Sequence, residues 1–313
     1  MEAATARLGR GRRRRKKRSY GSEERRLATL LLSPSMVVIA LVAAYPIGYA
    51  VWLSLTEYSL QVPGKWRFAG FDNYTEAFGD SEFWEAVKNT FIFTGISVSL
   101  ELVIGLGMAL AMHAAFKGRG LLRTVVLVPW AVLTVVSAIT WRTLFEPNLG
   151  LAPQILDTIG IGENIVWLGQ EGYAMAVMIL ADVWKTAPFM ALLLLAGLQV
   201  IPDDVYDAAK VDGATAWQRF RRITIPLLMP AILVALIFRT LDALRIFDLP
   251  FVLTGGTNGT TTLSLIAHRE LTTNNLIGYG SALSVLTFVI VMAVSFIYIR
   301  TVGGNIKSLA EEG

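Results

Sequence analysis

Six charged residues lie in or beside long apolar stretches of this chain. They are, in chain order, Asp182, Lys185, Arg239, Asp242, Arg245 and Asp248. The last four recur every three residues with alternating sign, a spacing at which neighbours on a helix can pair. A charge at the centre of a bilayer costs roughly 2.5–3.5 kcal/mol on insertion scales, so such residues must pair or face water. Two interpretations stay open: a structural ladder of ion pairs, or the polar wall of a solute path. Alternating donors and acceptors favour a neutral polyhydroxylated solute over an ion.

Four further residues in the apolar stretches rank behind these six. Glu101 and Arg142 are charged, and Trp130 and Trp184 have ring faces on which a sugar can stack. Tryptophans in membrane proteins more often pack or anchor at the interface. We therefore place all four outside the main set.

Other chemistry is excluded by what the chain lacks. It contains no cysteine, so disulfides, thiol catalysis and cysteine metal sites are ruled out. Its two histidines, His113 and His268, are far apart in sequence and show no ligand spacing. No G-x-x-x-x-G-K-S/T sequence occurs, so the chain has no phosphate cradle of that type. We expect no catalytic residue and no metal site.

The elements that must position these charges are membrane helices. The chain has 313 residues, 54% hydrophobic and 17% charged, which is less charge than a soluble domain carries. Several continuous apolar runs approach the roughly 20 residues that a spanning helix requires. We predict an all-α polytopic membrane protein with six transmembrane helices. They lie within Leu27–Leu55 and at Thr90–Phe116, Thr124–Leu144, Tyr173–Val200, Pro226–Phe247 and Ile277–Ile299.

The second span carries small residues at four-residue spacing, Gly107, Ala111 and Ala115. Small residues on one face allow close approach of helices in lipid. We predict that this face packs against a neighbouring helix or a second subunit.

The segment Ile201–Pro226 is a polar, charged insert between two apolar runs. Good helix formers at Val205–Val211 are followed by Gly213 and by a basic amphipathic run to Thr224, which predicts helix–turn–helix. Pro226 suits the first turn of the next helix, where its missing N–H is not needed. We expect a helical elbow between two spans, shaped to be held by a cytoplasmic partner.

The distribution of Lys and Arg predicts the orientation. With the N-terminus inside, the inner segments hold 20 of these residues and the outer loops hold 4, which favours cytoplasmic N- and C-termini. We divide the chain into a basic cytoplasmic tail (1–26), a transmembrane domain (27–300) with the elbow at 201–226, and a cytoplasmic C-terminal tail (301–313). The basic tail is interpreted as a topology signal, with no nucleic-acid partner.

Six residues of the elbow follow a spaced pattern: Asp207, Ala208, Ala209, Gly213, Ile223 and Pro226. This pattern resembles the EAA loop of ABC-importer permeases, which reads E-A-A, three residues, G, nine residues, I-x-L-P. Asp207 replaces Glu and Ile225 replaces Leu. In the family this loop docks into a cleft of the ATPase subunit. The resemblance therefore implies that these six residues couple the chain to an ATPase.

The resemblance extends along about Leu27–Ile299. WKTAPFMALLLLAGLQVIP (Trp184–Pro202) and FDLPFVLTGGTNGTTTLSL (Phe247–Leu265) are similar to the flanks of the EAA loop in carbohydrate permeases of the maltose-transporter type. FRTLDALRIFD (Phe238–Asp248) most resembles the first permease subunit of actinobacterial trehalose importers. The resemblance implies an ABC importer type I permease fold and a sugar substrate, a disaccharide such as trehalose.

The resemblance also implies an assembly. It comprises a second homologous permease, two ATPase subunits and an extracytoplasmic solute-binding protein in the inner or plasma membrane of a bacterium. The chain is then a transport subunit rather than an enzyme, it holds no cofactor, and Mg-ATP is bound by the partner ATPase. The alternative is an ion-gradient-driven secondary transporter. Such proteins often contain paired internal repeats, which are not evident in this sequence, and the elbow would have no role there.

Overall fold

A computed structural model describes residues 20–62, 64, 66–114, 117–161 and 165–311. The chain divides into two compact units, Met1–Tyr49 and Ala50–Gly313, and each is described by itself. Most of the predicted N-terminal tail lies outside the described residues.

The first unit contains helical segments whose apolar side chains are exposed. They are α1 (Tyr20–Ile39), the π-helical turn η1 (Ala40–Ala44) and the start of α2 (Tyr45–Ser54). The π turn ends at Ala44, two residues before Pro46, whose missing N–H removes one regular helical hydrogen bond. The helix nevertheless continues from Arg25 to Ser54, and it is long and apolar enough to form the predicted first span.

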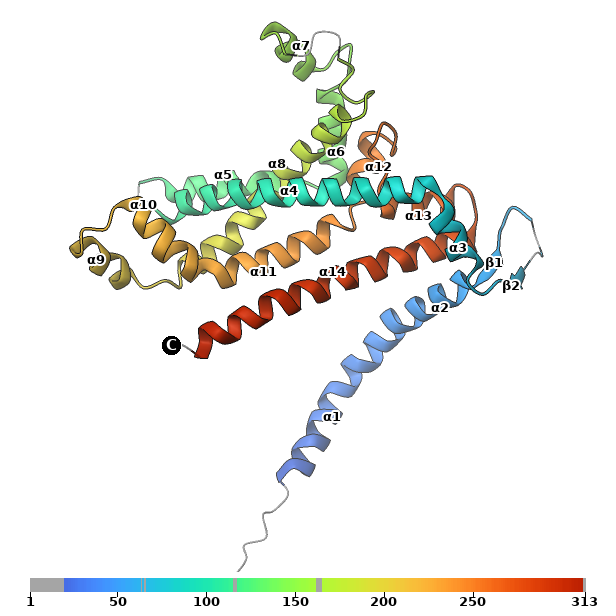
Figure 1. Ribbon diagram of the computed structural model, residues 1–313, viewed down its shortest axis with the longest axis horizontal. Coiled ribbons are helices and arrows are strands. Elements are labelled where there is room, and N and C mark those ends of the chain that lie inside the picture. Colours follow the sequence, from blue (N-terminus) through green and yellow to red (C-terminus); the bar gives the residue numbers. More distant parts are fainter. Residues whose placement is uncertain (1–19, 63, 65, 115–116, 162–164, 312–313) are drawn as a thin grey trace, which may run out of the picture. The chain divides into compact units, whose positions relative to one another are not determined.

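The second unit contains the remaining elements, which Figure 1 labels. They are β1 (Thr56–Tyr58), β2 (Trp66–Phe68), α3 (Asp72–Gly79), α4 (Ser81–His113), α5 (Arg119–Ala131), α6 (Thr134–Leu144), α7 (Leu151–Thr158), α8 (Tyr173–Leu198), α9 (Asp203–Val211), α10 (Ala216–Arg219), the π turn η2 (Phe220–Thr224), α11 (Ile225–Ala243), α12 (Asp248–Leu253), α13 (Leu263–Thr272) and α14 (Ile277–Glu311). The two strands form an antiparallel hairpin in which Glu57 faces Arg67.

Among the described residues, five helices are long and apolar enough to cross a membrane, and a bent pair makes a sixth. The bent pair is α5 and α6, which meet at 88°. The predicted third span, Thr124–Leu144, is therefore divided between two helices that meet at a sharp bend. Pro129 removes a hydrogen bond from the last turn of α5, and the backbone is extended at Val132. The fifth span is also shorter than predicted, because α11 ends at Ala243 instead of Phe247.

Helix α8 forms the centre of the second unit. Of the residues in its apolar window, 67% are buried, against 33% for α4 and 22% for α14. It contacts α4, α5 and α11 (Figure 1). A helix this apolar on every side is typical of the interior of a bundle.

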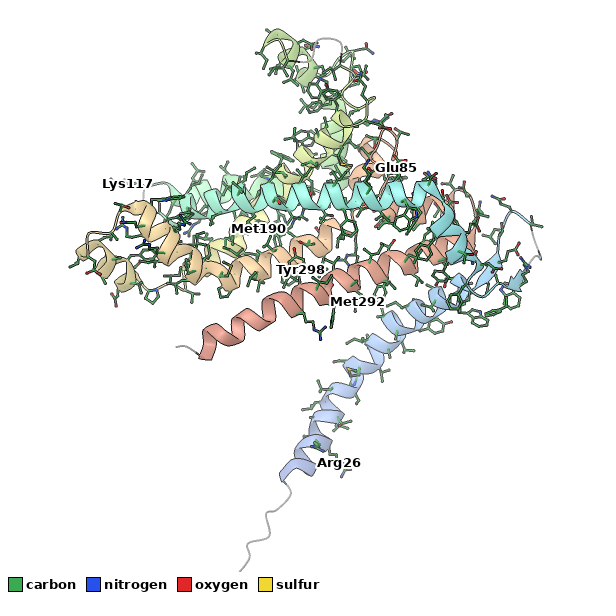
Figure 2. All side chains as sticks on the ribbon, viewed as in Figure 1. Arg26, Glu85, Lys117, Met190, Met292 and Tyr298 are labelled. Carbon is green, nitrogen blue, oxygen red and sulfur yellow. The ribbon has the colours of Figure 1, made fainter. Side chains whose placement is uncertain are left out.

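Close packing of α4 on α8 depends on Gly105. A Cβ added there would lie 2.8 Å from Met190 Cγ, whereas one added at Gly107 would meet nothing within 4 Å. The buried face of α4 therefore contains Gly105 and Ala109. The predicted face with Gly107 and Ala111 is exposed and meets no other helix of the described chain, so its packing on a second subunit stays a prediction; Ala115 lies outside the described residues. Met190 lies in the middle of the bundle (Figure 2).

The two ends of the second unit are formed by different elements. The hairpin, α3 and α13 lie at one end, and α9 and α10 lie at the other (Figure 1). Glu85 marks the first end and Lys117 the second in Figure 2. At the first end, Arg269 of α13 donates to Glu82 of α4 at 2.6 Å. This hydrogen bond raises the pKa of Arg269 above its ordinary value, so its guanidinium stays charged.

Candidate functional site

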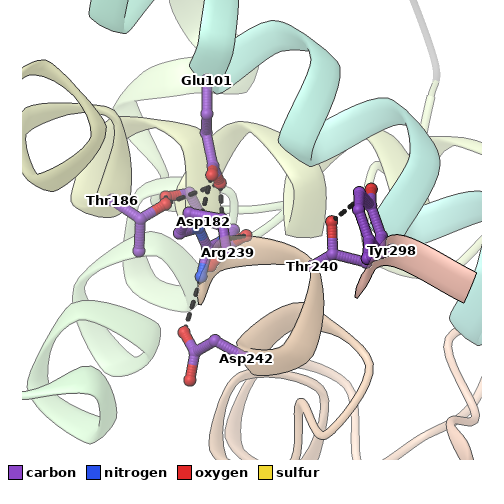
Figure 3. Close-up of polar contacts among 7 residues, drawn as sticks. All are labelled: Glu101, Asp182, Thr186, Arg239, Thr240, Asp242 and Tyr298. Carbon is purple, nitrogen blue, oxygen red and sulfur yellow. Dashed lines mark hydrogen bonds and ion pairs between the residues drawn. The ribbon is translucent and has the colours of Figure 1, made fainter. Parts of the chain in front are cut away.

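Four charged side chains from three helices meet inside the second unit (Figure 3). We call Glu101, Asp182, Arg239 and Asp242 the charge cluster. The Arg239 guanidinium donates from Nε to Glu101 Oε2 at 2.5 Å and from Nη2 to Glu101 Oε1 at 2.6 Å. It also donates to Asp182 Oδ2 at 2.8 Å and to Asp242 Oδ2 at 2.6 Å. Three carboxylates therefore share one buried cation, and each of the three guanidinium nitrogens of Arg239 donates to a carboxylate.

Burial divides the cluster into an inner and an outer part. The side chains of Arg239, Glu101 and Asp182 are 3%, 0% and 7% exposed, while that of Asp242 is 68% exposed. Thr186 supports the inner part by donating to Glu101 Oε1 at 2.6 Å. The cluster thus holds one accessible carboxylate, Asp242, on a buried anchor.

The predicted ladder of ion pairs forms only at its first step. Arg239 pairs with Asp242, but Arg245 donates from Nε to the carbonyl of Leu241 at 3.0 Å and has no ion pair in the described part of the chain. Asp248 is exposed at the start of α12. The ladder fails because α11 ends at Ala243, and the helical spacing it requires ends there.

Glu101, which we placed outside the main set of charged residues, is a fully buried member of the charge cluster. It lies 138 residues before its partner Arg239, and nothing local in the sequence indicates the pairing. One signal was available: Glu101 is the only acidic residue between Glu85 and Glu146, in a stretch read as a membrane span. An isolated carboxylate inside a membrane requires a cation as its partner, and for Glu101 this cation is Arg239.

Trp184 and Lys185 follow Asp182 along α8 by two and three residues. Lys185 is half-buried and makes no ion pair among the residues described. Trp184 is 42% exposed, and its ring meets Trp141 edge-on at 6.2 Å, with Trp141 stacked on Phe145 at 5.8 Å. Because side chains two residues apart on a helix do not face each other, the Trp184 ring lies on another face of α8 than Asp182.

A groove of about 600 Å³ lies between the end of α11 and the helices α13 and α14. Arg245 and Phe247 line it, together with His268, whose ring lies 4.6 Å from that of Phe247. Asp242 is not among the lining residues. Arg245 and Asp242 therefore belong to different spaces, although both were predicted on one wall.

The polar insert folds as the predicted helix–turn–helix. Helix α9 ends at Val211, and Gly213 follows with φ of 75°. A left-handed backbone of this kind favours glycine because it lacks a Cβ. Asp207, Ala208 and Pro226 are exposed, while Ala209 and Ile223 are half-buried.

Side-chain hydrogen bonds brace the two arms of the elbow. The hydroxyls of Tyr206 on α9 and Thr224 on η2 lie 3.1 Å apart. Thr215 and Gln218 form a capping box at the start of α10. The hydroxyl contact therefore ties α9 to η2, which continues directly into α11.

Residues 102–302 match the family described as "Binding-protein-dependent transport system inner membrane component". The chain belongs to this family. It is therefore an ABC-importer permease, as the elbow motif predicted, and the all-α membrane fold is confirmed. A permease of this kind is not an enzyme, because ATP hydrolysis belongs to a separate subunit.

Two relatives cover nearly the whole permease. The trehalose transport system permease protein SugA of Mycobacterium tuberculosis is 44% identical over 90% of this chain and 90% of its own. The trehalose/maltose transport system permease protein MalF of Thermococcus litoralis is 44% identical over 88% of this chain and 94% of its own.

A solved structure shares the fold of the permease. A bacterial alginate ABC transporter, in complex with an alginate pentasaccharide-bound periplasmic protein, matches with a TM-score of 0.76 and 23% identity. The match covers 89% of the permease and 94% of that chain. The permease is an inner-membrane protein that works with a partner permease, ATPase subunits and a binding protein. Nothing supports the alternative of an ion-gradient-driven transporter.

Proposed function

We propose that the permease carries a disaccharide of the trehalose type into the cell and that Asp242 contacts the sugar. The observation that carries the assignment of Asp242 is its accessible carboxylate, 68% exposed, held at 2.6 Å by the buried Arg239. A fixed carboxylate accepts hydrogen bonds from sugar hydroxyls without reorganising. The names of the two relatives, which concern trehalose and maltose, support the substrate class.

The remaining members of the predicted path take supporting roles in this proposal. Arg239 and Asp182 position Asp242, and we assign Lys185, on the neighbouring helix α8, as a donor to the sugar. We assign Arg245 and Asp248 to the rim of the sugar path. Arg245 lines the separate groove, and Asp248 is exposed at the start of α12.

We further propose that the elbow, with Asp207, Ala208, Ala209, Gly213, Ile223 and Pro226, docks on an ATPase subunit. The support is the left-handed turn at Gly213 and the hydrogen bond between Tyr206 and Thr224. The complete importer would contain two permeases, two ATPase subunits that bind Mg-ATP, and an extracytoplasmic solute-binding protein. Both termini of the permease would be cytoplasmic.

The test is uptake by the reconstituted importer from a panel of labelled sugars. We expect ATP-dependent uptake of trehalose or a related disaccharide, and competition by unlabelled disaccharide but not by monosaccharide. Uptake of an amino acid or an ion in place of every sugar in the panel would overturn the substrate class. Loss of trehalose uptake in the Asp242→Asn variant, with the ATPase still bound, separates the sugar contact from the docking role.

A further inference from the structure

We propose that the elbow holds the phosphate group of an anionic phospholipid between Arg219 and Arg222. A pocket of about 440 Å³ lies between the turn at Gly213 and the following helical turn. Its lining comprises Asp212, Gly213, Ala214, Gln218, Arg219, Arg222 and Ile223. Two guanidiniums on one pocket favour a phosphate, whose oxygens accept several charge-assisted hydrogen bonds. This inference is independent of the proposed sugar; because its pocket shares Gly213 and Ile223 with the proposed docking surface, the ATPase content of each variant is measured beside its lipid retention.

The two arginines have no partner within the described part of the chain. Neither Arg219 nor Arg222 forms an ion pair or a side-chain hydrogen bond there, whereas Lys210 on the other arm is neutralised by Asp207 at 2.7 Å. Asp212 also lines the pocket, and its carboxylate opposes anion binding. With two arginines and one aspartate, the pocket lining has one positive charge in excess, which favours an anion.

The pocket lies at the depth of lipid headgroups. Helix α11 has 19 residues, or about 28 Å at 1.5 Å per residue, close to the roughly 30 Å of the hydrocarbon core. Arg222 precedes Pro226 in the same helical stretch by four residues, which is about 6 Å. Trp217, 66% exposed and stacked on Phe220, provides the aromatic side chain that is typical of this depth.

An exposed apolar stripe on α11 begins at the pocket. Ile223 lines the pocket, and Leu227, Val234 and Phe238 follow at positions that share its helix face. These three side chains are 49%, 46% and 60% exposed. The stripe offers a surface for an acyl chain that runs into the membrane from the phosphate. Pocket and stripe together fit a phospholipid better than a free phosphate.

The experiment compares lipid retention by the purified importer in nanodiscs that contain phosphatidylglycerol and phosphatidylcholine. Native mass spectrometry measures how much of each lipid stays bound. We expect phosphatidylglycerol to be retained selectively, and the Arg219→Gln/Arg222→Gln variant to reduce this retention about 25-fold, since each arginine at the surface contributes about fivefold. Arg221→Gln is the matched control, because Arg221 is exposed on the same turn but does not line the pocket. Asp212→Asn should increase retention.

Other occupants give different results. An equal loss of phosphatidylglycerol retention in the Arg221→Gln control would overturn the site, because any nearby cation would then be enough to hold the lipid. Equal retention of phosphatidylcholine would overturn the anion preference. Displacement of the lipid by excess inorganic phosphate would assign the pocket to free phosphate. Loss of the ATPase subunits from the double variant, with lipid retention unchanged, would assign the arginines to the ATPase.

Discussion

Arg239 and Glu101, 138 residues apart in the sequence, join α11 to α4 through two hydrogen bonds of 2.5 and 2.6 Å in the interior of the permease. Both side chains are at most 3% exposed. A buried ion pair of this kind is weak evidence for net stability, but the loss of one partner leaves a buried charge without compensation. The pair therefore fixes which helices can be neighbours, and it sets the position from which Asp242 is held.

The first prediction concerns this pair. Arg239→Leu should destabilise the permease by about 3–5 kcal/mol, because Glu101 and Asp182 lose their shared cation. The measurement is the amount of folded permease in the membrane and its thermal unfolding in detergent. Arg245→Leu is the control, since Arg245 has no ion pair in the described region. Equal losses in the two variants would show that the charge cluster does not stabilise the fold.

The second prediction concerns the accessible carboxylate. Asp242→Asn should leave the protein level near normal and lower the initial rate of disaccharide uptake roughly tenfold, because a hydrogen bond to a charged acceptor is lost. Asp248→Asn provides a matched control, as Asp248 is exposed and lies beyond the end of α11. An unchanged uptake rate in Asp242→Asn would remove this residue from the path.

A third prediction follows from the broken ladder. Exchanging Asp242 and Arg245 would rescue a variant only if these two residues paired with each other. Instead the exchange places a second guanidinium against Arg239, where Asp242 now lies at 2.6 Å, and like charges at that distance repel. We expect Asp242→Arg/Arg245→Asp to accumulate no better than Asp242→Arg alone, measured as protein level in the membrane. Recovery in the exchange variant would contradict the Arg239–Asp242 pairing.

The fourth prediction concerns the elbow. At Gly213 the left-handed backbone costs a residue with a side chain about 1–2 kcal/mol, although a Cβ would meet nothing within 4 Å. Gly213→Val should therefore insert normally but retain less ATPase on purification and transport more slowly. Gly213→Asn, which tolerates this conformation better, should be milder. If both variants copurify with a full complement of ATPase, the turn is not required for docking.

The fifth prediction concerns the contact between α4 and α8. Gly105→Ala should lower thermal stability by about 1–3 kcal/mol through overpacking against Met190. Met190→Ala in the same chain should restore part of the loss. Gly107→Ala, where the added methyl group has open space, should be neutral or slightly stabilising. A reversed order of Gly105→Ala and Gly107→Ala would contradict the observed packing face.

Features that depend on local composition can be predicted from the sequence alone. Apolar runs of sufficient length predicted the spans, and the spacing of Asp207, Gly213 and Pro226 predicted the elbow and the family. Helix–turn–helix geometry at Gly213 also follows from local preferences, since glycine is the residue that adopts positive φ without strain.

Which charges meet and which helix faces pack depends on long-range contacts, which become visible in the folded chain. A membrane helix is apolar on every side, so periodicity cannot distinguish a face toward protein from a face toward lipid; for this reason the sequence indicated Gly107 where the structure packs Gly105. The ladder from Arg239 to Asp248 assumed a helix that in fact ends at Ala243. Glu101 reaches Arg239 because α4 and α11 lie side by side, and that proximity comes from long-range packing, which no spacing within either helix records.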